Sequence, residues 1–145
     1  MIVVLDTNVI VSGILKPDGP PGQVLDLLVT GQITAAYDDR LLMEYNDVLT
    51  RPKLALNPER VQTFLDVIRL AGIAVADPPP LTIAEAHIPD KDDVPFAEVA
   101  LAASANALIT GNRRHFEFLT GQLMQVFAPA EFLDYLASLS NAPQP

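Results

Sequence analysis

The sequence predicts an α/β domain in which a central parallel sheet of about five strands lies between two layers of helices. Short apolar segments of strand length alternate with longer segments whose apolar residues recur at helical spacing. This alternation is typical of parallel sheets, because the helices form the crossover connections and cover both faces. The first segment, residues 2–5, is apolar at every position, as expected of a strand buried on both faces.

The predicted elements follow one another in a regular order. Strands are expected at residues 2–5, 33–37, 73–76, 107–110 and 124–127. Helices are expected at residues 9–15, 24–29, 40–50, 58–71, 93–106, 113–119 and 130–139. Thr7 or Asn8 fits the cap of the first helix, and a proline- and glycine-rich turn at residues 17–22 precedes the second.

Length and hydropathy indicate one domain. The chain of 145 residues predicts a single domain over residues 1–139, followed by a frayed polar tail at residues 140–145. Half of the residues are hydrophobic, but no apolar run approaches the roughly 18–20 residues of a membrane helix. The first residues lack the features of a signal peptide, so we expect a cytoplasmic protein without membrane contact.

Composition excludes several classes of site. There are no cysteines, which excludes disulfides, thiolate catalysis and zinc–cysteine sites, and the two histidines argue against a multi-histidine metal site. A net charge of −9 argues against broad, non-specific nucleic-acid binding, but it is compatible with a basic partner or with a divalent cation among acids. Among the few basic residues, Arg51 and Lys53 lie close together, and Arg113 and Arg114 are adjacent.

Three acids occupy related places in the predicted fold. Asp6 follows the first strand, Asp93 begins a helix on its packing face, and Glu44 lies at the margin of the apolar stripe of the helix after the second strand. Ligand sites of open parallel sheets form at the carboxyl ends of the strands, where Asp6 and Asp93 are expected. Converging carboxylates repel one another, and Mg²⁺ or Mn²⁺, which prefer carboxylate and water oxygens, would remove that repulsion.

Each acid also fits a purely structural role. Asp6 alone fits a helix cap, and either Asp92 or Asp93 fits the cap of the helix that follows. Glu44 fits a surface acid whose aliphatic stem covers apolar neighbours. Spacing by itself leaves these alternatives open.

The ordered set of motifs resembles the PIN-domain ribonucleases over nearly the whole chain. It consists of Val-Leu-Asp6-Thr-Asn8-Val, Glu44 on a helix, Asp92-Asp93-x-x-Phe96 before an alanine-rich helix, and Ala107-Leu-Ile-Thr110-Gly-Asn112. Within that family, the motifs look most like those of VapC-like toxins of toxin–antitoxin pairs. The resemblance implies an α/β/α fold, Mg²⁺- or Mn²⁺-dependent cleavage of single-stranded RNA, a homodimer, and inhibition by a cognate antitoxin.

The resemblance also implies roles for individual residues. The metal-binding and catalytic acids of the family fall on Asp6, Glu44 and Asp93, and its supporting polar residues fall on Thr7, Asn8 and Thr110.

The chain departs from the family pattern after Thr110. A fourth acid is often found there, and this sequence has Asn112 and His115 instead. The number of metal ions, one or two, therefore stays open. Asn112 fits an outer ligand or a helix cap, and His115 fits a surface or partly packed residue. Arg113 and Arg114, near the same sheet edge, are candidates for contacts with the RNA backbone, or form a solvated helix start.

Two other hypotheses fit parts of the sequence. One is a catalytically weak or inactive interaction module of the same fold that binds a basic partner. The other is a phospho-acceptor receiver domain with Asp77 as the acceptor, which is disfavoured because Ala128 and Pro129 follow the last strand where a lysine is needed.

Overall fold

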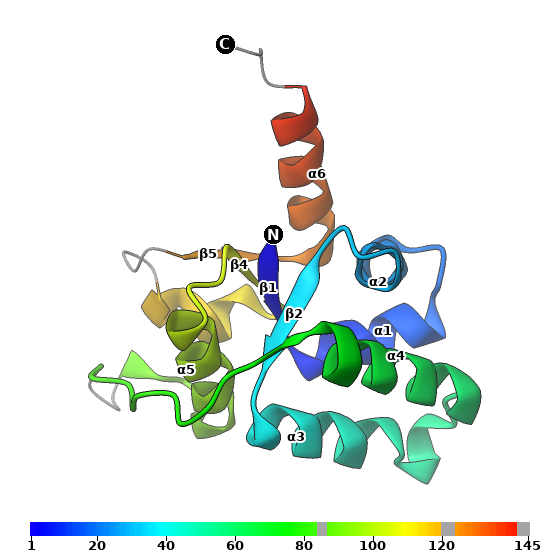
Figure 1. Cartoon of the computed structure of the whole chain (residues 1–145), viewed down its shortest axis with the longest axis horizontal. Helices are drawn as coiled ribbons and strands as arrows, with labels where there is room; N and C mark the ends of the chain where they lie inside the picture. Colours follow the sequence, from blue (N-terminus) through cyan, green and yellow to red (C-terminus); the bar gives the residue numbers. More distant parts are fainter. Residues whose placement is uncertain (84–86, 120–123, 142–145) are drawn as a thin grey trace.

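A five-stranded parallel sheet forms the centre of the molecule, as predicted (Figure 1). The computed structural model describes residues 1–83, 87–119 and 124–141. The strands occur in the order β3-β2-β1-β4-β5. Their bounds are β1 Ile2–Leu5, β2 Thr34–Tyr37, β3 Ile73–Ala74, β4 Ala107–Ile109 and β5 Gln125–Phe127.

The strand order creates a switch point between β1 and β4. The chain runs outward from β1 through β2 to β3, and then returns to place β4 and β5 on the other side of β1. The pairing of Leu5 with Ile109 brings the carboxyl ends of β1 and β4 side by side. Connections diverge at such a point and leave a crevice in which α/β proteins bind ligands.

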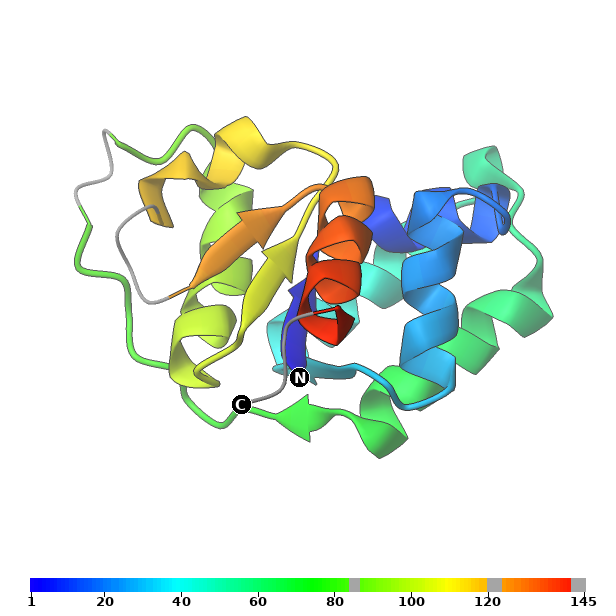
Figure 2. The ribbon, with the colours of Figure 1, turned by 90° about the horizontal axis from the view of Figure 1, so that it is seen from above.

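Six α-helices and three 3₁₀-helices of the described part surround the sheet. Helix α5 contacts β1, β2 and β4 on one face, and α2 packs against α6 on the opposite face (Figures 1 and 2). The α-helices are α1 Thr7–Leu15, α2 Pro20–Val29, α3 Asp39–Leu49, α4 Pro58–Ala71, α5 Val94–Ala102 and α6 Pro129–Ser140. The 3₁₀-helices are η1 Pro52–Leu54, η3 Lys91–Asp93 and η4 Arg113–Leu119.

The core explains why the central strands read as apolar at every position. Val3, Val4 and Leu5 of β1 and Leu108 of β4 are fully buried, since helices cover both faces of these strands. At roughly 25 cal/mol per Å² of apolar surface, burial of each such side chain stabilises the fold by about 1.5–3 kcal/mol. The central strands are therefore a rigid base for the residues that follow them.

Several helix boundaries differ from the prediction. Helix α1 begins at Thr7, so neither Thr7 nor Asn8 is its cap; Asp6 holds the cap position but makes no side-chain capping bond. Helix α2 begins at Pro20, because proline is well suited to the first turn, where its missing N–H is not needed. Helix α5 ends at Ala102, and Ser104 after it has a left-handed φ of 50° that cannot continue a helix.

The predicted tail overlaps the last helix by one residue. Helix α6 extends to Ser140, and residues 142–145 of that tail lie outside the described residues. Among the helices of the described part, none has the length and hydropathy needed to cross a membrane.

Candidate functional site

Asp6 and Thr110 meet where β1 and β4 end. The Asp6 amide donates to the carbonyl of Ile109 at 2.9 Å and so continues the ladder one residue beyond β1. The hydroxyl of the fully buried Thr110 donates to Asp6 Oδ2 at 2.8 Å. The two strand ends therefore hold the Asp6 carboxylate in one orientation at the switch point.

Asn8 links the start of α1 to the turn after β4. Its Nδ2 donates to Asp6 Oδ2 at 3.2 Å, and its Oδ1 accepts from the Gly111 amide at 3.0 Å. A Cβ atom at position 111 would lie 3.3 Å from Asn8 Oδ1, so glycine allows this close approach. Asn8 therefore connects Asp6 with the turn after Thr110, and its supporting role in a site stays a prediction.

Glu44 reaches the same edge of the sheet from α3. The hydroxyl of the buried Thr7 donates to Glu44 Oε2 at 2.7 Å. The next residue, Tyr45, is buried, and its hydroxyl donates to the carbonyl of Leu5, the last residue of β1. These two contacts fix α3 against the end of β1 and turn Glu44 toward Asp6.

Burial raises the pKa of the Asp6 carboxyl above its ordinary value. The hydrogen bonds from the Thr110 hydroxyl and the Thr7 amide oppose this rise, and the negative charge of Glu44 adds to it. The charge of His115 also lowers the pKa of Asp6, so the net rise reflects mainly the burial of the carboxyl.

Asp93 is the acid whose surroundings most disfavour a charged carboxylate. It is only 8% exposed at the junction of η3 and α5, and within the described ranges its Oδ2 has no hydrogen-bond donor. His115 Nδ1 lies 3.1 Å from that oxygen, within the distance of an ion pair when the imidazole is protonated. Burial, and next the charge of Asp6, raise the pKa of Asp93 to about 6, whereas the positive charge of His115 lowers it.

Asp90 and His115 add to the predicted acids. Among the described histidines and acids, Asp90, Asp93 and His115 form the one group whose ligand atoms all lie within 4.8 Å of one another. Asp6 and Glu44 lie outside this group. The charge of Glu44 raises the pKa of Asp6, and the charge of Asp6 raises the pKa of Asp93. The roles of Asp6, Glu44 and Asp93 as ligands stay predictions.

The structure confirms one expectation about this cluster and corrects another. His115 is partly buried, as expected, and it contacts Asp93, which the sequence did not indicate. Neither Asp92 nor Asp93 makes a side-chain capping bond; Asp90 caps η3 by accepting from the Asp92 amide at 2.9 Å. The Asp93 side chain therefore caps neither helix and faces His115 instead.

This donor set suits a divalent cation. Carboxylate oxygens with one imidazole nitrogen nearby are common ligands of first-row divalent metals, and carboxylates alone suit Mg²⁺ and Mn²⁺. A cation beside Asp93 Oδ2 would supply the partner that this buried oxygen lacks. Its charge would also offset the burial of the two carboxyls and the repulsion between neighbouring acids, which together raise the pKa values of Asp6 and Asp93.

The residues after Thr110 have mixed surroundings. The amide of Asn112 donates to the Thr110 hydroxyl at 3.0 Å, and its side chain is exposed. Arg113 pairs with Glu131 of α6 at 2.7 Å, and Arg114 is exposed. Arg113 is thus held toward α6, which leaves Arg114 as the more accessible of the two arginines.

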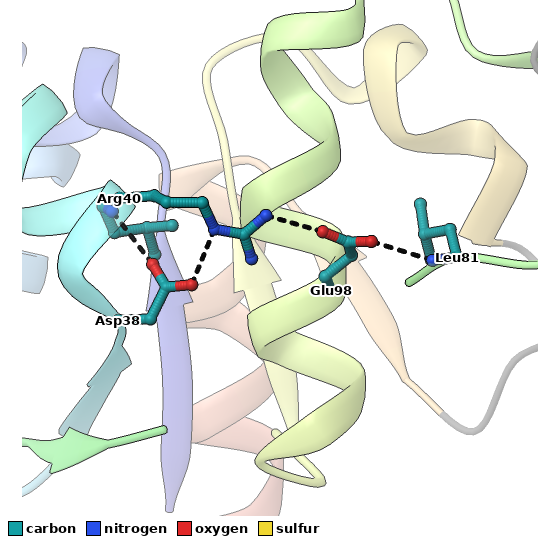
Figure 3. Close-up of polar contacts among 5 residues, drawn as sticks. Asp38, Arg40, Leu81 and Glu98 are labelled. Atoms are coloured by element: carbon teal, nitrogen blue, oxygen red, sulfur yellow. Dashed lines mark hydrogen bonds and ion pairs between the residues drawn. The ribbon is translucent and has the colours of Figure 1, made fainter. Parts of the chain in front are cut away.

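A second polar network joins the helices that bear Glu44 and Asp93 (Figure 3). Arg40 donates to Asp38 at 2.8 Å and to Glu98 at 2.7 Å, and both acids are buried. Glu98 also accepts from the Leu81 amide at 2.8 Å, and Asp38 caps α3 through the Leu41 amide. Sequence reasoning missed this network, and a charged residue at position 98 within the apolar α5 was the only signal of it.

Most of the site lies inside a region that matches a known protein family. A family model described as "PIN domain" matches residues 2–114 of the chain. An uncharacterized protein of Methanocaldococcus jannaschii is 29% identical over 114 residues, which cover 77% of this chain and 70% of the relative. No solved structure matches the chain significantly. The matched region contains Asp6, Glu44, Asp93 and Thr110, and it ends just before His115.

Proposed function

Because the chain belongs to the PIN domain family, whose members are in general nucleases, we propose that it is a metal-dependent endoribonuclease that cleaves single-stranded RNA. The observation that supports this most strongly is the position of Asp6 and Asp93. Burial raises the pKa values of both carboxyls, and the charge of Asp6 raises the pKa of Asp93 further, beside the switch point of a parallel sheet.

In this proposal Asp6, Glu44 and Asp93 hold the cation, and His115 and Asp90 stand next to Asp93 as further donors. Mg²⁺ or Mn²⁺, when bound, would supply charge stabilisation for the phosphodiester and activation of a water molecule. The mixture of carboxylates with an imidazole favours Mn²⁺ over Mg²⁺, since Mg²⁺ binds mainly oxygen ligands.

The surrounding residues orient the acids. Thr110 and Asn8 both donate to Asp6 Oδ2, and the Thr7 amide also hydrogen-bonds the Asp6 carboxylate. Thr7 donates to one oxygen of Glu44 in the same way. Hydrogen bonds of this kind fix ligand geometry before the substrate arrives, so that no reorganisation is needed during the reaction.

The main test compares acid-to-amide variants at the site with one on the surface. We expect Asp6→Asn and Asp93→Asn to lower the rate of cleavage of an unstructured RNA in Mn²⁺ by at least about 100-fold, because each removes a charged ligand. Asp26→Asn on the exposed face of α2 is the matched control and should cleave at the wild-type rate.

Circular dichroism of each variant distinguishes a damaged site from a damaged fold. Equal cleavage by the wild-type protein and by folded Asp6→Asn and Asp93→Asn would contradict the proposal. Calorimetric titration with Mn²⁺ separates it from a catalytically inactive interaction module. Saturable binding that Asp93→Asn abolishes supports the nuclease, and an absence of Mn²⁺ binding by the wild type supports the module.

We extend the proposal to the toxin of a toxin–antitoxin pair that acts as a homodimer in the cytoplasm. The support is the resemblance of the motifs around Asp6, Glu44 and Asp93 to VapC-like toxins. Induced expression should arrest growth of a bacterial host, and Asp6→Asn should not. Light scattering should give twice the mass of the 15.7 kDa chain.

A further inference from the structure

A cavity opens beside the acids, on the side of α1 that faces α3 and η1. It has a volume of about 350 Å³ and shares Thr7 and Asn8 with the acidic site. That volume falls within the range of about 300–1,000 Å³ found for small-molecule sites. We call it the α1–η1 pocket. Its first wall is one side of α1, where Val11 and Ser12 follow Thr7 and Asn8 at helical spacing.

The opposite wall combines an apolar floor with two cations. Val48 of α3 and Leu54 of η1 are partly buried and lie across from Val11. Arg51, which directly precedes η1, and Lys53 within η1 line the same pocket and are exposed. The apolar side chains thus form the inside of the pocket, and the charged groups reach the solvent.

The two cations stand out against the charge of the whole protein. The chain has nine lysines and arginines against eighteen acids, and two of those nine line this one pocket. Arg51 pairs with Asp47 one turn earlier at 2.9 Å, and both side chains are more than half exposed. Such exposed pairs are weak, so an incoming anion can compete for the guanidinium. Throughout the described ranges, Lys53 forms no ion pair.

We propose that the α1–η1 pocket binds one nucleotide of the RNA substrate, adjoining the bond that is cut. The phosphate of this nucleotide pairs with Arg51 and Lys53. Its base and ribose pack against Val11, Val48 and Leu54. The inference rests on the proposed nuclease function, and it explains how a protein with a net charge of −9 attracts RNA at the edge of its acidic site.

The first test uses two isosteric charge changes of equal size. Asp47→Asn releases Arg51 from its partner, and Asp66→Asn releases Arg69 from the equivalent exposed pair on α4. Fluorescence anisotropy with a labelled single-stranded uridine oligonucleotide, in Ca²⁺ to prevent cleavage, measures RNA binding. We expect Asp47→Asn to tighten binding several-fold and Asp66→Asn to leave it within twofold of the wild type. Equal effects of the two variants would overturn the pocket assignment.

The second test removes the cations. In the double variant Arg51→Gln with Lys53→Gln, the dependence of log affinity on log salt concentration should flatten by about 0.7 for each phosphate that the protein no longer neutralises. The double variant Arg69→Gln with Lys16→Gln has the same net charge outside the pocket and should keep the wild-type slope. If both double variants change the slope equally, RNA responds to overall charge and the pocket assignment is wrong.

The third test identifies the occupant. Methyl NMR of the metal-free protein is recorded during titration with uridine monophosphate and, separately, with inorganic phosphate. Shifts of the Val11, Val48 and Leu54 methyl groups with the nucleotide but not with phosphate support a nucleotide subsite. Unchanged methyl chemical shifts, or equal shifts with both probes, would overturn the nucleotide subsite. If the methyl shifts are unchanged and the variants also keep the RNA affinity of the wild type, the pocket would instead be a surface for a protein partner.

The outcomes separate this inference from the proposed function. If the Arg51 and Lys53 changes do not affect cleavage, the pocket assignment is wrong and the proposed nuclease function still holds. If the wild type neither binds nor cleaves RNA, both proposals are wrong.

Discussion

At the scale of single residues, Asp93 opposes folding and favours a ligand. Its carboxyl is buried, faces the charge of Asp6, and has an oxygen without a hydrogen-bond donor. In the unfolded chain the same carboxyl is solvated and titrates near its ordinary pKa of 3.8. The folded protein therefore binds a proton more readily than the unfolded chain at this position, which gives stability a definite dependence on pH.

The sign of that dependence follows from the raised pKa. Above pH 6 the Asp93 carboxyl is charged in both states, and the folded state alone bears the cost of burying that charge. As the pH falls through 6 toward 4, the folded state takes up a proton and the cost is removed. In EDTA, we expect the free energy of unfolding to rise as the pH is lowered from 8 to 5, as measured by urea denaturation.

Asp93→Asn tests whether this residue is the cause. The amide is never charged, so at pH 8 the metal-free variant should be more stable than the wild type by on the order of 1–3 kcal/mol. At pH 5 the difference should shrink. Asp26→Asn on the surface should change neither value, and a wild-type pH profile retained by Asp93→Asn would contradict the assignment.

At the scale of secondary structure elements, Arg40 joins two helices that approach the site from different parts of the chain. It pairs with Asp38 at the start of α3 and with Glu98 on α5. Helix α3 bears Glu44 and α5 begins directly after Asp93, so this bridge sets the distance between the two helices. Arg40 is a positioning residue that acts through the helices.

Removal of Arg40 should weaken both the fold and the site. In Arg40→Gln, Asp38 and Glu98 remain buried without their cation, which should lower the free energy of unfolding by about 1–3 kcal/mol, discounted because Arg40 is 44% exposed. Arg69→Gln, which breaks an exposed pair with Asp66, should cost less than about 0.5 kcal/mol.

A purely structural role and a positioning role differ in the metal affinity. We expect Arg40→Gln to weaken Mn²⁺ binding measured by calorimetry at a temperature where the variant is fully folded. Arg40→Lys keeps one charge and should restore part of the affinity. Unchanged Mn²⁺ affinity in Arg40→Gln would show that Arg40 stabilises the fold without positioning the acids.

At the scale of the whole molecule, the strand order gathers acids that are far apart in the sequence. The return of the chain to β4 beside β1 places Thr110 against Asp6, across 104 residues. Helix α3 brings Glu44 to Thr7, and η3 brings Asp93 into the field of Asp6. The strand order therefore concentrates negative charge near the switch point between β1 and β4.

A ligand that binds only the folded state stabilises that state by mass action. Mn²⁺ at about 100 times its dissociation constant should raise the free energy of unfolding by about 2.7 kcal/mol. Thermal denaturation should show a higher midpoint in Mn²⁺ than in EDTA for the wild type and no difference for Asp93→Asn. An equal shift in both proteins would place the cation elsewhere.

The sequence alone predicted the type and order of the elements. Apolar runs such as Ile2–Leu5 and helical stripes such as that of α3 are local patterns. They predict the elements correctly because the same apolar residues are buried in one hydrophobic core. Boundaries were less accurate where a single backbone angle decided them, as the left-handed Ser104 does after α5. The sequence also predicted Asp6 and Thr110 at the ends of strands, whereas the strand order of the structure makes these two strands neighbours.

Only the tertiary structure decided which side chains meet. The contacts of His115 with Asp93, of Arg113 with Glu131, and of Arg40 with Glu98 join residues that no local pattern relates. Each depends on how separate helices pack, which is set by the shapes of many buried side chains together. The sequence thus determined the fold and its acids, and packing determined which of those acids is buried and which partner it faces.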